Sequence, residues 1–134
     1  MLRKINIETI THDAFIDVTD EVRRCMKEEG FENGIIIVYC PHTTAGITIN
    51  ENADPDVKRD MLMRLAEVYP WEHTHDKHAE GNTAAHLKAS TVGISQTVIA
   101  ANGDIILGTW QGIYFCEFDG PRNRTMYIKG MADK

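Results

Sequence analysis

One run of β-branched and apolar residues, from Gly34 to Cys40, constrains the fold more than any other feature of the sequence. It reads Gly-Ile-Ile-Ile-Val-Tyr-Cys, so apolar side chains would point to both faces of a strand. Pro41 follows directly and has no N–H to donate to a neighbouring strand, so the strand should end there. The chain therefore needs a sheet in which this segment is a central, covered strand.

Hydrophobic periodicity and turn residues predict the other elements around this strand. A period of two between Leu2 and Ile10 predicts a strand, and Asn102-Gly103 predicts a tight hairpin because both residues tolerate positive φ. Further strands are expected at residues 46–50, 93–100, 104–107, 113–118 and 125–129. Helices are expected from Thr19 up to Gly30, from Pro55 up to Pro70 with Asp54 as its cap, and from Thr83 to Ser90 with Asn82 as its cap.

The length of 134 residues is that of one domain, because single cores typically comprise about 100–200 residues. The order of strands and helices predicts an α+β fold for residues 1–134: a mostly antiparallel, sandwich-like sheet with two or three helices. Strand order does not follow from the sequence.

The composition excludes two classes of protein. With 14 basic against 20 acidic side chains the net charge is −6, the wrong sign for general nucleic-acid binding. No apolar run approaches the roughly 18 residues that a membrane helix needs. The three cysteines, Cys25, Cys40 and Cys116, are odd in number and have no CxxC spacing, which indicates reduced thiols and a cytoplasmic protein.

Histidine is the unusual residue, with six in the chain and four of them at positions 73, 75, 78 and 86. Neutral imidazoles are common zinc ligands, and three protein ligands with an open position are typical of a catalytic zinc site. The spacing allows two triads: His73, His75 and His86, or His42, His75 and His86. The alternative is an exposed, polar loop without a metal.

A carboxylate near the expected strand at 46–50 is a candidate for proton transfer. Glu51 follows that strand and would act as a general base or hydrogen-bond a metal-bound imidazole. The alternative is a solvated turn residue. Asp54 is better explained as a helix cap alone.

Two turn segments near the C-terminus contain groups that bind anions. Arg122 and Arg124 lie just before the last strand, and guanidinium groups suit phosphate oxygens. Thr109 and Gln111, between two glycines, would add neutral donors. Ordinary turns have the same composition, so each signal alone is weak.

Taken together, these segments resemble the YjbQ family, whose members are often labelled secondary thiamine-phosphate synthases. The resemblance covers nearly the whole chain and rests on six segments in the same order. They are His42-Thr43-Thr44-Ala45-Gly46 with Asn50-Glu51-Asn52; Asp54-Pro55; Arg59-Asp60-Met61; His75-Asp76 with His86-Leu87-Lys88-Ala89-Ser90; Gly108-Thr109-Trp110-Gln111-Gly112-Ile113; and Arg122 to Arg124.

The resemblance implies a sandwich-like α+β fold, a homotrimer and a metal or anion site near the matched histidines. It selects His42, His75 and His86 as ligands of a divalent ion, zinc in the first place and magnesium as the alternative. His42 and Glu51 would be catalytic. The substrate-binding residues would be Thr44, Ser90, Thr109, Gln111, Arg122 and Arg124.

The implied substrate is a small anionic or phosphorylated metabolite. A thiamine-phosphate synthase joins a pyrimidine carried as a pyrophosphate to a thiazole phosphate, and pyrophosphate leaves. Three histidines suit zinc-bound water better than the magnesium expected for pyrophosphate departure. A metal-dependent hydrolase and a non-catalytic metabolite-binding protein are therefore the alternatives to a weak transferase.

Overall fold

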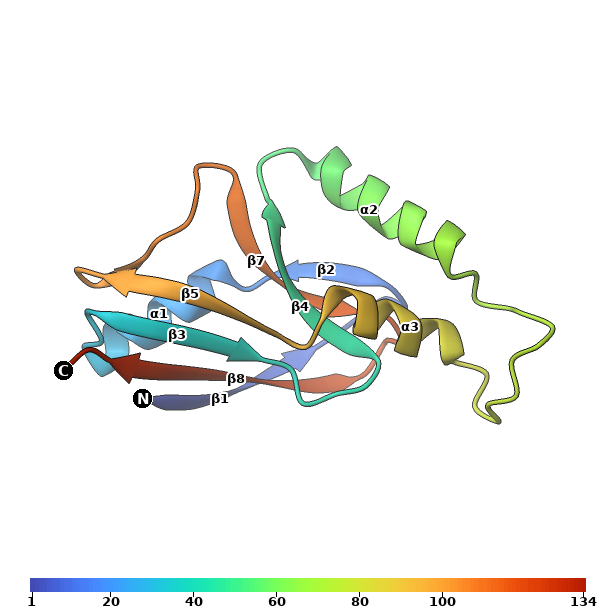
Figure 1. Cartoon of the computed structure of the whole chain (residues 1–134), viewed down its shortest axis with the longest axis horizontal. Helices are drawn as coiled ribbons and strands as arrows, with labels where there is room; N and C mark the ends of the chain where they lie inside the picture. The colour runs from blue at the N-terminus through green and yellow to red at the C-terminus, as the bar shows by residue number, and fades with distance from the viewer.

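The computed structural model describes residues 1–134 as two antiparallel sheets with three helices (Figure 1). The strands are β1 (Leu2–Glu8), β2 (Ala14–Asp17), β3 (Gly34–Tyr39), β4 (Ala45–Glu51), β5 (Ser95–Ala101), β6 (Asp104–Ile105), β7 (Gln111–Glu117) and β8 (Asn123–Ala132). The helices are α1 (Thr19–Glu29), α2 (Pro55–Val68) and α3 (Thr83–Val92). This confirms the predicted α+β class.

The larger sheet has the order β1-β8-β3-β5-β6 and the smaller one has the order β2-β7-β4. Every strand pair is antiparallel. The run beginning at Gly34 forms β3, which lies between β8 and β5 and is therefore central, as predicted.

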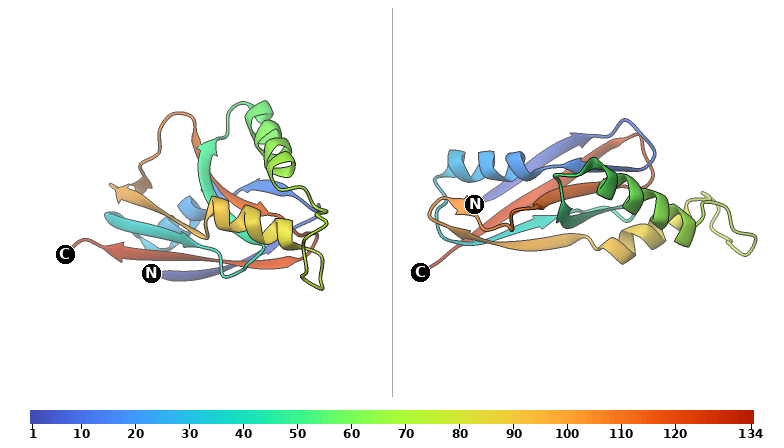
Figure 2. Two further views of the ribbon diagram at one scale, coloured as in Figure 1. Left: turned by 45° about the vertical axis from the view of Figure 1, so that its right-hand side comes forward. Right: turned by 90° about the horizontal axis from the view of Figure 1, so that it is seen from above.

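The main core lies between the two sheets, and α1 closes one side of it (Figure 2). Its fully buried members come from both sheets and from α1, and include Val22, Met26, Ile36, Val38, Ile47, Phe115, Met126 and Ile128. A second cluster covers the other face of the smaller sheet. There Phe15, Tyr114 and Phe118 pack against Ala85 and Ala89 of α3.

Local signals place several chain reversals as the sequence predicts. α1 ends at Gly30 with φ 62°, and the hairpin residues Asn102 and Gly103 have φ 53° and 84°. Asp54 caps α2 by accepting a hydrogen bond from the N–H of Asp56 at 2.9 Å. At these positions the local backbone conformation favours particular residue types, so the sequence alone predicts the turns and helix ends.

A close backbone approach fixes α3 against the smaller sheet. The N–H of Ile47 in β4 donates to the carbonyl of Gly93, directly after α3, at 2.9 Å. A Cβ at Gly46 would lie 2.5 Å from that same carbonyl oxygen. Glycine at position 46 therefore permits the contact that holds α3 beside the start of β4.

Local structure differs from the expectations at three places. The strand β2, at residues 14–17, is not among the expected strands, because four residues are too few to show a period. The side chain of Asn82 makes no capping hydrogen bond to α3. The expected strand at 104–107 is only two residues long.

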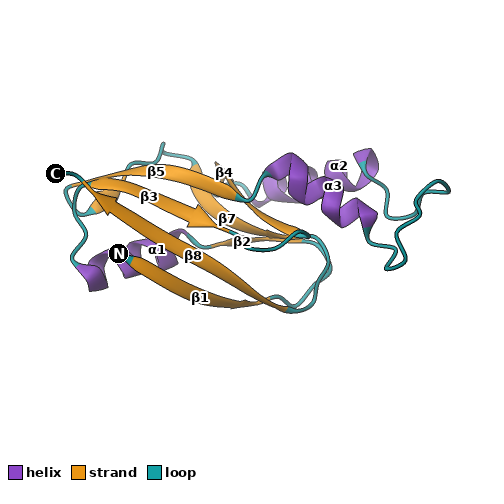
Figure 3. Cartoon of the chain, turned by 60° about the horizontal axis from the view of Figure 1, so that its bottom comes forward, coloured by secondary structure: helices purple, strands orange, loops and turns teal.

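The outer face of the larger sheet is exposed and carries an apolar patch beside polar residues such as Lys4, Thr97 and Lys129. On β3, Ile36 and Val38 point into the core, whereas Ile35 and Tyr39 are 42% and 40% exposed. Ile35 is paired with Ile99 and Met131, which are 60% and 54% exposed. No helix crosses this face (Figure 3), so within one chain β3 is covered on one face only and not on both as expected.

None of the three helices is long and apolar enough to span a membrane.

Candidate functional site

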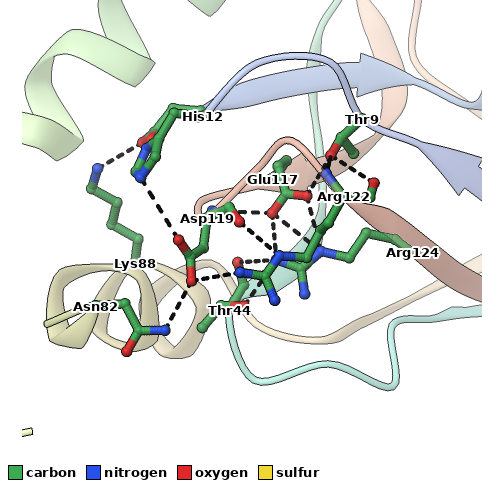
Figure 4. Close-up of polar contacts among 10 residues, drawn as sticks. Thr9, His12, Thr44, Asn82, Lys88, Glu117, Asp119, Arg122 and Arg124 are labelled. Atoms are coloured by element: carbon green, nitrogen blue, oxygen red, sulfur yellow. Dashed lines mark hydrogen bonds and ion pairs between the residues drawn. The ribbon is translucent and has the colours of Figure 1, made fainter. Parts of the chain in front are cut away.

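A buried ion pair joins the two sheets at one end of the sandwich (Figure 4). Glu117, the last residue of β7, is fully buried, and Arg124 near the start of β8 is 4% exposed. The Nε of Arg124 donates to both carboxylate oxygens of Glu117, at 2.9 and 3.2 Å, and its Nη2 donates to Oε2 as well. Two charges out of water require such close and complete pairing.

Two further donors complete the hydrogen bonding of Glu117. The hydroxyl of Thr9 donates at 2.7 Å and the backbone N–H of Asp119 at 3.0 Å. Burial by itself raises the pKa of Glu117, but the hydrogen bonds from Arg124, Thr9 and Asp119 outweigh it, and the pKa lies below its ordinary value. Glu117 is therefore a carboxylate at neutral pH.

The same arginine holds the connection between β3 and β4. Its Nη2 donates to the hydroxyl of Thr44 at 2.8 Å and to the carbonyl of Thr44 at 3.2 Å. Thr44, expected to contact substrate, is buried and its hydroxyl serves Arg124. The segment that leads from Pro41 into β4 is thus tied to the ion pair.

His42, in this segment, accepts a hydrogen bond from β8 at a position beyond the end of β3. β3 ends with Tyr39 opposite Tyr127, and beyond that end the N–H of Thr125 donates to the Nε2 of His42 at 2.9 Å. Burial and the nearby charge of Arg124 lower the pKa of His42, so its ring is neutral at pH 7. Because Nε2 accepts a hydrogen bond, the single ring proton must be on Nδ1.

A pocket of about 390 Å³ lies beside His42, between the end of β3 and α3. We call it the histidine pocket; it is lined by Tyr39, Cys40, Pro41, His42, Thr43, His86, Ala89, Ser90 and Ile94. His86 and Ser90 lie four residues apart on α3, so they share one helix face. The side chain of His86 makes no hydrogen bond within the chain, and its ring lies 5.5 Å from that of His78.

Asp119 accepts hydrogen bonds from two polar side chains beside the ion pair (Figure 4). The guanidinium of half-exposed Arg122 donates to the carbonyl of Asp119 at 2.8 Å and to its Oδ2 at 3.0 Å. The amide nitrogen of Asn82 donates to the same Oδ2 at 2.8 Å. Asn82 therefore holds the start of α3 to the β7–β8 connection, and in this orientation its Oδ1 is buried without a hydrogen-bond partner and does not cap the helix.

Glu51 lies far from the two histidines of the pocket. β4 runs from Ala45, beside the ion pair, to Glu51 at its other end, a distance of about 20 Å at 3.3 Å per residue. One carboxylate oxygen of Glu51 accepts from the N–H of Asp54 at 3.2 Å. Within one chain this is the geometry of a turn residue and not of a base beside His42.

Thr109 and Gln111 are also at that distant end. Gln111 pairs with Glu51 in the sheet, and its side-chain oxygen accepts from the N–H of Gly108 at 2.8 Å. Arg122 and Arg124 follow the opposite end of β7. The structure therefore does not bring the four expected anion-binding residues together in one chain.

His75 lies on the exposed connection between α2 and α3, with its ring 5.6 Å from that of His73. No three His, Cys, Asp or Glu side chains of the chain are arranged to hold a metal ion. His42 is also committed to Thr125 through Nε2 and carries its proton on Nδ1. A single folded chain thus does not supply the three-histidine zinc site, which stays a prediction of the sequence.

Glu117 and Thr9 are not among the residues that the sequence predicts for the site. Glu117 lies within the expected strand at 113–118. The available signal was a carboxylate within the otherwise apolar run Ile-Tyr-Phe-Cys-Glu-Phe, because a charge there is buried only when it is paired.

Comparisons with known proteins agree over the whole chain. The family described as "UPF0047 protein YjbQ-like" matches residues 3–133. The UPF0047 protein YugU of Bacillus subtilis is 66% identical over 132 residues, covering 98% of this chain and 100% of that protein. A UPF0047 protein of Methanocaldococcus jannaschii is 49% identical and covers 100% of this chain and 96% of its own length.

Solved structures show the same fold. A crystal structure of a YjbQ/UPF0047 family protein from Clostridium acetobutylicum has a TM-score of 0.93 at 53% identity, covering 96% of this chain and 99% of that one. A protein from Aeropyrum pernix has a TM-score of 0.93 at 32% identity, covering 99% of each chain.

Removing the arginine of the ion pair should destabilise the fold strongly. Arg124→Met leaves a buried carboxylate without its partner, at an expected cost of about 3–5 kcal/mol in the free energy of unfolding. The matched control Arg122→Met, at a half-exposed pair, should cost about 0–1 kcal/mol. Urea denaturation measures both, and an equal loss in the two variants would contradict this account.

Acid should remove the contribution of Glu117. Because the pKa of Glu117 is lowered on folding, its contribution is complete above the ordinary glutamate value of about 4.3 and is lost as pH falls through the folded value. The stability difference between the wild type and Glu117→Gln should therefore shrink below about pH 4. A difference that stays constant down to pH 2 would show that folding does not lower the pKa of Glu117.

Metal content tests the three-histidine zinc prediction. If His42, His75 and His86 bind one ion, each His→Ala variant should lose zinc on purification, whereas His73→Ala and His78→Ala should keep it. Inductively coupled plasma mass spectrometry of the five variants measures this. Equal zinc in all five refutes the triad.

Proposed function

The chain belongs to the YjbQ-like UPF0047 family, and from its geometry we propose that it binds a small phosphorylated metabolite in the histidine pocket and acts on it there. The observation that carries this proposal is the neutral, fixed ring of His42. Its Nε2 accepts from Thr125, so Nδ1 is a hydrogen-bond donor whose orientation is fixed before a ligand arrives.

The pocket combines neutral donors with a nearby cation. Thr43 and Ser90 line the pocket together with His42, and the charge of Arg124 is close enough to lower the pKa of His42. Phosphate oxygens accept hydrogen bonds from hydroxyl groups and from an imidazole N–H, whereas Arg124, which is paired with Glu117, contributes only through its charge. The net negative charge of the protein does not prevent this, because the recognition is local.

His86 is the proton-transfer residue in this proposal. Its ring nitrogens make no hydrogen bond to the protein, and it lines the same pocket as His42. An imidazole changes charge near neutral pH and serves as both acid and base. Glu51, which the sequence suggested for this role, lies at the other end of β4.

The resemblance to secondary thiamine-phosphate synthases indicates which reaction to test first. In that reaction a pyrimidine pyrophosphate reacts with a thiazole phosphate and pyrophosphate leaves. The pocket's donors would hold departing phosphate oxygens, and we assign no step to a metal because the single chain supplies no three-ligand site. Hydrolysis of a small phosphate ester is the second candidate, favoured by the uncommitted ring of His86 beside Ser90.

We assign the protein to the cytoplasm on the state of its thiols. All three cysteines are free and buried. Burial raises the pKa of Cys40 to about 11 and raises that of Cys116 as well. Such thiols are protonated and inert, as in proteins of reducing compartments.

We further propose that the exposed apolar face of the larger sheet is the interface of a homotrimer. The family resemblance predicts a trimer, and the face formed by Ile35, Tyr39, Ile99 and Met131 provides an apolar surface for it. Exposed apolar patches often mark protein–protein contacts. Closed symmetric assembly would cover it in each copy.

Phosphate binding tests the role of the histidine pocket. Isothermal titration with pyrophosphate should show binding to the wild type that weakens about tenfold in His42→Gln, the effect of losing one strong hydrogen bond. His73→Gln is the matched control on the exposed loop and should bind like the wild type. Equal pyrophosphate affinities in these two variants would contradict the proposed site.

A reaction assay with the two thiamine precursors identifies the reaction. The wild type should release pyrophosphate, and His86→Gln should not.

Sedimentation tests the trimer. The wild type should sediment at three times the 15.1 kDa of one chain, and the paired substitutions Ile35→Lys and Ile99→Lys should yield the single chain because they place charges in the apolar face. Ile10→Lys, at an 85% exposed residue outside the strands, is the control and should stay trimeric. A 15.1 kDa wild-type species at micromolar concentration would refute the assembly.

A further inference from the structure

A buried lysine lies at the floor of a second groove, between α2 and α3. The side chain of Lys88 is 4% exposed, and its Nζ donates to the Oδ2 of Asp13 at 2.7 Å. The groove has a volume of about 570 Å³. We call it the Lys88 groove; it is lined by His12, Asp13, Leu62, Met63, Ala66, Trp71 and Lys88.

The Lys88 groove is separate from the histidine pocket. Lys88 follows His86 by two residues, which places the two side chains on opposite faces of α3. The two cavities share no lining residue. Figure 4 shows Lys88 reaching toward the turn before β2, away from Thr44 and Arg124.

The ammonium group of Lys88 has donors to spare. It has three N–H groups, and the structure gives it one acceptor, Asp13, plus the ring of Phe118 with its centroid 5.9 Å away. The other oxygen of Asp13 already contacts the Nδ1 of His12. Lys88 is therefore paired with Asp13 but has N–H groups left for a further acceptor, whereas both oxygens of Asp13 are already engaged.

Apolar side chains form most of the walls of the groove. Leu62 is partly buried against the second cluster, whereas Met63 is 49% exposed and Ala66 is exposed as well. Trp71 lies at its rim with its ring edge-on to His12, the ring centroids 4.4 Å apart. A ligand with an apolar body would cover these side chains.

We propose that the Lys88 groove binds a small organic anion with an aromatic or aliphatic body, whose anionic oxygens accept hydrogen bonds from Lys88. The volume is that of typical small-molecule sites, about 300–1,000 Å³. The donor excess at the floor selects an acceptor group, and the apolar walls select against simple inorganic anions. This site and its ligand are independent of the function proposed for the histidine pocket.

Fluorescence of Trp71 provides a direct test. The chain has two tryptophans, and Trp110 lies in the distant β6–β7 connection, so a Trp110→Phe protein reports on the groove alone. The probe is 1-anilinonaphthalene-8-sulfonate, an aromatic anion, and its neutral relative N-phenyl-1-naphthylamine is the matched ligand without the sulfonate. The expected result is saturable energy transfer from Trp71 to the anionic probe.

The double substitution Lys88→Met with Asp13→Asn removes the charges as a pair and leaves no unpaired carboxylate. It should weaken binding of the anionic probe at least tenfold and leave the affinity for the neutral probe unchanged. Ala66→Phe, which keeps Lys88 and Asp13, fills the groove and adds no tryptophan, should abolish binding of both probes. Equal sulfonate affinity in the double variant, or no transfer from Trp71 because another copy of the chain covers the groove, would overturn the proposal.

Discussion

The buried pair of Glu117 and Arg124 is the interaction on which the rest of the structure depends. It links the last residue of β7, in the smaller sheet, to β8 in the larger one. Thr9 after β1, Thr44 before β4 and the backbone of Asp119 contribute further hydrogen bonds. A charge pair buried this deeply is tolerated only when it is closely paired and hydrogen-bonded, so separate chain segments must meet in one arrangement.

That arrangement determines the histidine pocket. Arg124 and Thr125 are consecutive residues of β8: the first holds Thr44, and the second donates its backbone N–H to His42. The ring of His42 takes the place of a strand beyond the end of β3, since a backbone donor there needs an acceptor. The tautomer of His42 thus follows from the sheet edge, and the pocket receives a fixed donor on one side while His86 on α3 faces it from another.

Much of the fold can be predicted from the sequence because its signals are local. Gly30, Asp54-Pro55 and Asn102-Gly103 mark turns and helix ends through backbone conformation, and β3 is recognised by its composition. β2 was missed because four residues are too few to show a period and its stability comes from pairing with β7. The sequence also does not show that the outer face of β3 is open in a single chain. An apolar strand face has the same sequence pattern whether a helix covers it or not.

The site was predictable only in part for the same reason. His42 and His86 were selected through the family resemblance, and the structure places both in one pocket. Glu51, Thr109 and Gln111 enter the same expected site through the family resemblance, but which strand ends meet is decided by strand direction in the sheet. Lys88 and Asp13 are 75 residues apart, so no sequence spacing indicates their contact.

The protonation state of His42 tests the central claim most directly. Long-range ¹H–¹⁵N correlation spectra of the protein labelled in its histidine nitrogens distinguish the two neutral tautomers and the cation, and the His42→Gln variant assigns the signals. The account predicts a neutral ring at pH 7 with its proton on Nδ1. A proton on Nε2, or a charged ring at that pH, would contradict it, because neither form can accept a hydrogen bond from Thr125 at Nε2.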